Sequence, residues 1–137
     1  MNQLEALQAA LAGEHAALYG VGVAGGKLNG AKFRAAGELF EAHRANRDRL
    51  SALIAAAGET PVAAEPAYDL PRAVVNAATA AALVLVVEVR IAAVYGDLVE
   101  AAEQPAVRAF AIEALLAAAG NQLAWGGVPL AFPGATA

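Results

Sequence analysis

Four side chains that could do chemistry interrupt otherwise apolar helical faces in this sequence. Alternating spacings of four and three residues mark the face that a helix turns towards a bundle core. When the chain is traced in this way, three predicted helices have apolar faces except near their midpoints. The interrupting residues are Glu14, His43, Arg47 and Glu88.

These four residues are expected to meet in one layer, because antiparallel helices in a bundle align their midpoints. A buried carboxylate is costly unless it is protonated, paired or bound to a cation. The guanidinium of Arg47 could take a carboxylate through two hydrogen bonds, and His43 could donate to another. The sequence therefore predicts a buried ion-pair layer in which Arg47 is the main counter-ion of Glu14 and Glu88.

The alternative for the same layer is a metal site. Carboxylate and imidazole ligands suit iron, manganese or zinc. A guanidinium at Arg47 would repel a divalent cation, so the ion-pair interpretation is favoured, and no metal or cofactor is assigned. If iron or manganese did bind, the ligands would be Glu14, His43 and Glu88, with help from Glu41 or Glu113.

The composition indicates which elements position this layer. The chain has 137 residues, enough for one domain spanning 1–137, and alanine is its commonest residue. Alanine has the highest helix propensity and lets helices approach closely, so the fold class is expected to be all-α. The absence of cysteine excludes disulfides, thiolate metal sites and cysteine nucleophiles.

The chain is predicted to form two long helical hairpins joined by a crossover linker, which is the topology of a four-helix bundle. Glycines between 20 and 26 allow a break in the first helix, and Asn29-Gly30 suits a left-handed helix end. The residues after 125 are rich in Gly and Pro and should form an irregular tail to 137. The predicted helices run from about Asn2 to Leu28, Ala31 to Ala57, Asp69–Pro71 to Ala102, and Gln104–Pro105 to Ala124.

The fourth predicted helix has two possible orientations. Its strongest apolar face contains Ile112, Leu116, Ala119 and Leu123, and turning this face inwards would turn Glu113 away from the core. A rotated register would bring Glu113 into the polar layer. The sequence leaves both orientations open.

Charge and hydropathy limit the partners. A net charge of −4 argues against nucleic acid, which needs clustered Lys and Arg. The apolar run from Ala73 to Val87 is shorter than the roughly twenty residues of a membrane span, and the N-terminal stretch does not resemble a secretory signal, so a cytoplasmic location is expected. Only 16% of residues are charged, which favours coverage of apolar surface by a second copy, through the first or third helix.

The chain also resembles the ferritin-like superfamily. The segment from Glu88 to Tyr95 matches the Glu-x6-Tyr spacing of that superfamily, and Glu14 to Tyr19 gives a shortened version. More specifically, it resembles the alanine-rich ferritin-like domain family of unknown function found in actinobacterial genomes. That likeness is carried by EHAALYGVGV at 14–23, HRANRDRL at 43–50, YDLP at 68–71 and FPG at 132–134.

The resemblance implies a ferritin-like bundle without an assigned activity. Metal-binding members of the superfamily use single Glu residues on two helices and Glu-x-x-His on the other two. Here the residue three after Glu41 is Arg44, and the residue three after Glu113 is Leu116, so both Glu-x-x-His motifs are missing. We therefore favour a non-catalytic protein without a di-iron centre. The alternatives are a metal-binding protein with oxidoreductase or metal-handling activity, and a helical interaction module that acts through dimerisation.

Overall fold

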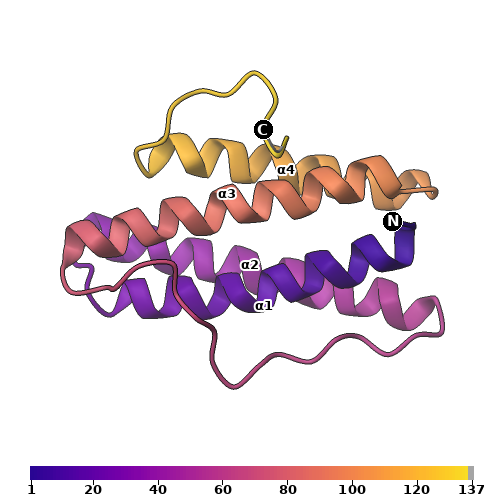
Figure 1. The fold of residues 1–137 in the computed structure, drawn as a ribbon, viewed down its shortest axis with the longest axis horizontal. Helices are drawn as coiled ribbons and strands as arrows, with labels where there is room; N and C mark the ends of the chain where they lie inside the picture. Colours follow the sequence, from indigo (N-terminus) through magenta and orange to yellow (C-terminus); the bar gives the residue numbers. More distant parts are fainter. Residues whose placement is uncertain (136–137) are drawn as a thin grey trace.

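The computed structural model describes residues 1–135, which form an all-α four-helix bundle, as predicted (Figure 1). The two hairpins α1–α2 and α3–α4 are each antiparallel, and a long linker joins them. α3 is the central helix, since it packs against both α1 and α4. The helices are α1 (Gln3–Gly25), α2 (Gly30–Ala56), α3 (Ala77–Ala101) and α4 (Pro105–Ala124).

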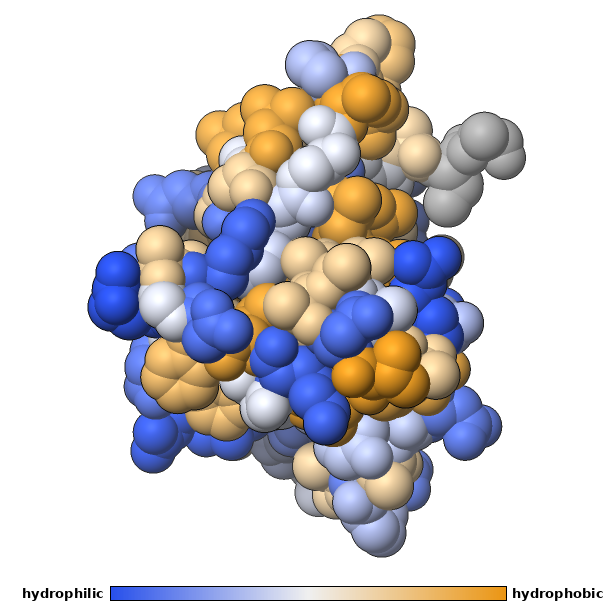
Figure 2. Space-filling model, turned by 90° about the vertical axis from the view of Figure 1, so that its left-hand side faces the viewer, coloured by the Kyte–Doolittle hydropathy of each residue, from blue (hydrophilic) through white to orange (hydrophobic). Residues whose placement is uncertain are grey.

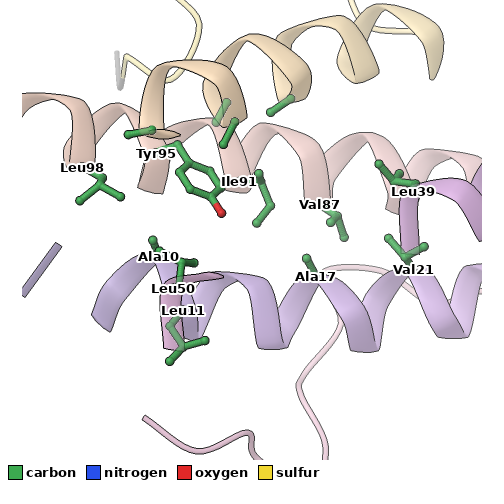
Figure 3. Close-up of a cluster of buried hydrophobic side chains, with 14 of the residues drawn as sticks. Ala10, Leu11, Ala17, Val21, Leu39, Leu50, Val87, Ile91, Tyr95 and Leu98 are labelled. Atoms are coloured by element: carbon green, nitrogen blue, oxygen red, sulfur yellow. The ribbon is translucent and has the colours of Figure 1, made fainter. Parts of the chain in front are cut away.

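Small residues on α1 let it approach α3 closely. A Cβ atom added at Gly20 would lie 2.9 Å from Val87 Cγ2, and one added at Gly13 would lie 3.2 Å from Val94 Cγ2. The buried core then fills the space between α1, α2 and α3 with aliphatic side chains (Figure 3). This close contact fixes how far apart the polar side chains on α1 and α3 can lie.

The third helix begins later than the sequence predicted. Asp69 and Pro71 resemble a helix start, but α3 begins at Ala77. Its N-cap is Asn76, whose side chain accepts a hydrogen bond from the backbone N–H of Thr79 at 2.9 Å, while the Thr79 hydroxyl caps the Asn76 backbone in return. This reciprocal cap satisfies the backbone N–H groups of Asn76 and Thr79, which have no intrahelical partner at the start of a helix, and so favours a start at Ala77.

The first helix is continuous but shorter than predicted. It runs through Gly20 without a break and ends at Gly25 rather than Leu28. Asn29 and Gly30 do not end it; Asn29 precedes the first turn of α2, and Gly30 has a φ of +56°. A side chain at position 30 would be strained in this left-handed conformation, so glycine is required there.

The linker lies along α1. Gln8 donates to the carbonyl oxygen of Thr60 at 2.8 Å and accepts from the backbone N–H of Val62, also at 2.8 Å. The His15 ring donates to the Val62 carbonyl oxygen at 3.0 Å. Further on, the Tyr68 ring packs on Tyr19 with centroids 5.7 Å apart. These contacts bring the last part of the linker across α1 and towards the start of α3 (Figure 1).

α4 is oriented differently from both sequence-based alternatives. Ile112, Leu116 and Leu123 are exposed, and so is Glu113. The reason is that small alanines allow α4 to lie close to α3, which leaves the bulky stripe outside. Figure 2 shows apolar side chains gathered at the top of the molecule, over α4 and the segment that follows it. The inward positions are Val107, Ala111, Ala114, Ala118 and Gln122.

Two cationic side chains of α2 lie over aromatic rings on α4 and at its C-terminal end. Lys32 Nζ lies 4.5 Å from the ring centroid of Trp125, and the Arg49 guanidinium lies 5.5 Å from that of Phe110. Such cation–π contacts each stabilise a structure modestly.

α3 is the one helix within residues 1–135 that is long and apolar enough to cross a membrane, judged by length and composition alone. In the bundle, 39% of its most apolar stretch is buried.

Candidate functional site

The candidate site is a buried polar layer at the middle of the bundle, centred on His43 of α2. Its Nδ1 atom lies 2.6 Å from Glu14 Oε2 of α1, and its Nε2 atom lies 2.7 Å from Glu88 Oε1 of α3. Glu14 and Glu88 are fully buried, and His43 is 3% exposed. One imidazole thus bridges two carboxylates from two other helices.

Glu14 is held by two further donors. The Tyr95 hydroxyl donates to Glu14 Oε1 at 2.6 Å, and Asn46 Nδ2 donates to the same oxygen at 3.1 Å. Figure 3 shows Tyr95 extending from α3 towards α1, with its hydroxyl at the end nearer α1. The Tyr95 ring is fixed from behind by an edge-on contact with Phe110 of α4. Three donors, from His43, Tyr95 and Asn46, therefore converge on the Glu14 carboxyl group.

Glu88 is held more loosely, by α4. Asn121 Nδ2 lies 3.3 Å from Glu88 Oε2, and Gln122 Nε2 lies 3.4 Å from the backbone carbonyl oxygen of Glu88. Gln122 is 4% exposed. Within residues 1–135, every buried side-chain nitrogen or oxygen has a hydrogen-bond partner. The layer is therefore satisfied by protein groups alone.

The carboxylates on either side of His43 favour its charged form. Both ring nitrogens face carboxyl oxygens, and with both carboxyl groups ionised each contact is a hydrogen bond when that nitrogen carries a proton. Burial lowers the pKa of His43, but the hydrogen bonds and negative charges of Glu14 and Glu88 outweigh burial and raise it to about 10. Burial and the nearby Glu14 carboxylate raise the pKa of Tyr95 above its ordinary value, so Tyr95 stays a hydrogen-bond donor.

The structure brings three of the four predicted layer residues together and leaves the fourth outside. Arg47 does not pair with Glu14 or Glu88; its Nε and Nη2 atoms donate to Asp48 Oδ1 at 3.0 and 2.9 Å. Its side chain is 33% exposed. The predicted pairing is wrong because Asn46, rather than Arg47, occupies the inward position next to His43, and His43 already supplies the positive charge.

The two other carboxylates considered as metal ligands also lie outside the layer. Glu41 pairs with Arg44 at 3.4 Å on the exposed face of α2, and Glu113 is exposed on α4. Within residues 1–135, no three His, Asp or Glu side chains are grouped so that they could share one metal ion.

Sequence reasoning missed the neutral members of the layer. Asn46 lies three residues after His43, and Asn121 and Gln122 are adjacent polar residues in a helix that is otherwise mostly apolar. That adjacent pair was the available signal, because two amides on an apolar helix need partners when they face the core. Tyr95 was singled out only for its spacing from Glu88, and not as a member of the site.

Comparison with known proteins shows the family of the chain and its similarity to a solved structure. No curated protein matches the chain. A conserved hypothetical protein, rv2844, from Mycobacterium tuberculosis has a crystal structure that matches with a TM-score of 0.87 and 33% sequence identity. The match covers 90% of this chain and 93% of that one. The model of a domain of unknown function, DUF4439, matches residues 6–137, and the chain therefore belongs to the DUF4439 family.

Proposed function

We propose that this protein is a non-catalytic ferritin-like bundle in which the imidazolium of His43 takes the place of a metal between Glu14 and Glu88. The observation that carries the proposal is the double contact of His43, at 2.6 and 2.7 Å. A metal-ligating imidazole must offer a lone pair to the ion. Both nitrogens of His43 instead point at carboxylate oxygens.

The charges of the layer support the same proposal. Two carboxylates and one imidazolium sum to a single negative charge, which the hydroxyl of Tyr95 and the amides of Asn46 and Asn121 spread over further hydrogen bonds. A divalent cation in this space would have to displace His43 from between the two carboxylates. The donor set therefore does not fit a two-metal centre.

The same proposal places the protein in the cytoplasm, without nucleic-acid or membrane partners. A net charge of −4 supports the absence of nucleic-acid partners, because acidic residues interrupt the most basic stretch, at 34–49.

The first test combines metal analysis with the protonation of His43. The protein is produced with added iron and manganese, and its metal content is measured for the wild type, Glu14→Ala and Glu88→Ala. We expect less than stoichiometric metal in all three. Nitrogen-15 NMR of the wild type at pH 8 should show protons on both ring nitrogens of His43. Stoichiometric metal that disappears in Glu14→Ala and Glu88→Ala, but persists in the exposed control Glu41→Ala, would overturn the proposal.

A second candidate function is a helical interaction module that forms a homodimer. The observation that favours it is the exposed stripe of Ile112, Leu116 and Leu123, which are 41%, 65% and 50% exposed. A contiguous exposed apolar stripe beside the exposed Leu130 and Phe132 is typical of a covered surface. This second candidate places the interface on α4, whereas the sequence favoured the first or third helix.

The dimer is tested by the mass of the protein in solution. Light scattering after size-exclusion chromatography should give twice the chain mass of 13.8 kDa at micromolar concentration. A single monomeric species over the whole concentration range would reject this second candidate and leave the metal-free proposal untouched.

A further inference from the structure

A cavity on the far side of the α1–α3 contact lies outside the polar layer. Its volume is about 260 Å³. Its floor is formed by small residues of α1, such as Gly13 and Ala16, and by branched residues of α3, such as Val86 and Val94. The linker segment 68–71 closes one side. Both helices therefore give the cavity an apolar lining, and the YDLP segment at 68–71 partly covers the cavity.

Two charged side chains of opposite sign line this apolar cavity. Arg90 lies on α3 and Asp69 on the linker, and both are exposed. Within residues 1–135 neither makes an ion pair, with each other or with any other residue, at up to 4.0 Å. An unpaired guanidinium and an unpaired carboxylate beside an apolar cavity are complementary to a ligand with both charges.

We propose that this cavity binds a small apolar α-amino acid. The carboxylate of the ligand would pair with Arg90, whose guanidinium fork matches a carboxylate. The ammonium group would pair with Asp69, and the aliphatic side chain would enter the cavity between Ala16 and Val86. This inference concerns a different part of the fold from the polar layer and does not depend on its metal content.

The size and the charges of the cavity favour a small amino acid over a long fatty acid as its ligand. A water molecule takes up about 30 Å³ in the liquid, so 260 Å³ accommodates roughly nine groups of that size. A long fatty acid would offer a carboxylate to Arg90 but no ammonium group to Asp69, so it would satisfy one of the two charges and leave the other unpaired.

The test is a calorimetric and NMR titration with leucine and two analogues that each lack one charged group. The analogues are 4-methylpentanoate, which lacks the amine, and 3-methylbutylamine, which lacks the carboxylate. We expect leucine to bind at least about tenfold more tightly than either, because each lost charged hydrogen bond leaves its protein partner unpaired. Absence of binding by leucine at millimolar concentration, or equal affinity for 4-methylpentanoate, would overturn the proposal.

Variants separate the two charged contacts. Arg90→Gln should weaken leucine binding about tenfold while leaving 3-methylbutylamine unchanged, and Asp69→Asn should weaken leucine while leaving 4-methylpentanoate no weaker. Arg34→Gln, an exposed position on α2, is the matched control and should bind leucine normally. If Arg90→Gln and Asp69→Asn also bind normally, the ligand is not held by these charges and the proposal fails.

A cavity-filling variant tests the location. Ala16→Leu should abolish leucine binding, whereas Ala12→Leu, on the exposed face of the same helix, should not. Circular dichroism and the thermal midpoint verify that both variants fold. Leucine binding retained in a folded Ala16→Leu protein would place the ligand elsewhere. A loss of dimer mass in Ala16→Leu would show that the groove seats a second copy, and would also overturn the proposal.

Discussion

The polar layer and the outer face of α4 reverse the usual distribution of side chains. In the layer, Glu14, His43 and Glu88 are buried, whereas on α4 the large apolar side chains of Leu116 and Leu123 are exposed. The layer is self-sufficient, because each buried polar group in the described chain has a partner. The α4 face stays largely exposed within the described chain, and only the segment after α4 lies beside Leu123. The comparison teaches that burial alone does not identify a functional surface; the presence or absence of partners does.

The largest effect on stability is expected when the imidazolium of His43 is removed from the polar layer. In His43→Ala, two buried carboxylates would lose their shared counter-charge, and we expect the free energy of unfolding to fall by about 3–5 kcal/mol. Chemical denaturation monitored by circular dichroism measures the change. Arg47→Ala is the matched control on the same helix, and its exposed pair with Asp48 should be worth less than about 1 kcal/mol. A larger loss for Arg47→Ala than for His43→Ala would reverse the roles assigned to these residues.

The second prediction concerns pH. The pKa of His43 is about 10 in the folded protein and 6.5 in an ordinary environment, so the folded state binds this proton more tightly than the unfolded chain does. The stabilisation is complete below pH 6.5 and is lost as the pH rises through about 10. We expect the free energy of unfolding to fall by on the order of 3 kcal/mol between pH 7 and pH 10. Denaturant titrations at several pH values measure it.

The same titrations on His43→Gln provide the control for the pH prediction. A neutral side chain at position 43 cannot titrate, so most of the decline between pH 7 and pH 10 should vanish in that variant. An equally steep decline in His43→Gln would mean that other groups cause it.

The smallest effect on stability is expected on α4. Leu116 is 65% exposed, so Leu116→Ser should change the free energy of unfolding of the isolated chain by no more than about 0.5 kcal/mol. The same change should convert a dimer to a monomer, measured by light scattering. Ala117→Ser, an exposed neighbour off the apolar stripe, should leave the dimer intact. If Leu116→Ser remains a dimer, the partner surface does not include this face.

The sequence predicted much of the fold because local signals and the global fold agree. Alanine-rich segments separated by Gly and Pro define four helices, and midpoint polar residues on three of them predicted that Glu14, His43 and Glu88 would meet. The structure places these three in direct contact. Periodicity succeeds here because a charged residue on a long apolar face is a strong signal.

The errors have physical causes. A strict alternation of four and three residues selects Arg47, whereas the real helix turns Asn46 inwards, and one residue of difference rotates a side chain by about 100°. The predicted orientation of α4 is wrong because the inward face was chosen for its large apolar side chains. Close packing on α3 instead selects the face with small side chains, which contains Ala111, Ala114 and Ala118. The start of α3 was predicted at Asp69–Pro71, whereas the Asn76–Thr79 cap sets it at Ala77. Composition does not distinguish these two starts.

The bridging position of His43 has a consequence for how the chain assembles. Glu14 and His43 belong to the α1–α2 hairpin, so this hairpin can pair one carboxylate before α3 arrives. If α1 and α3 docked without α2, two carboxylates would be enclosed with no cation between them. Partly assembled states that lack α2 are therefore disfavoured, and the three helices should gain and lose their structure in a single cooperative transition.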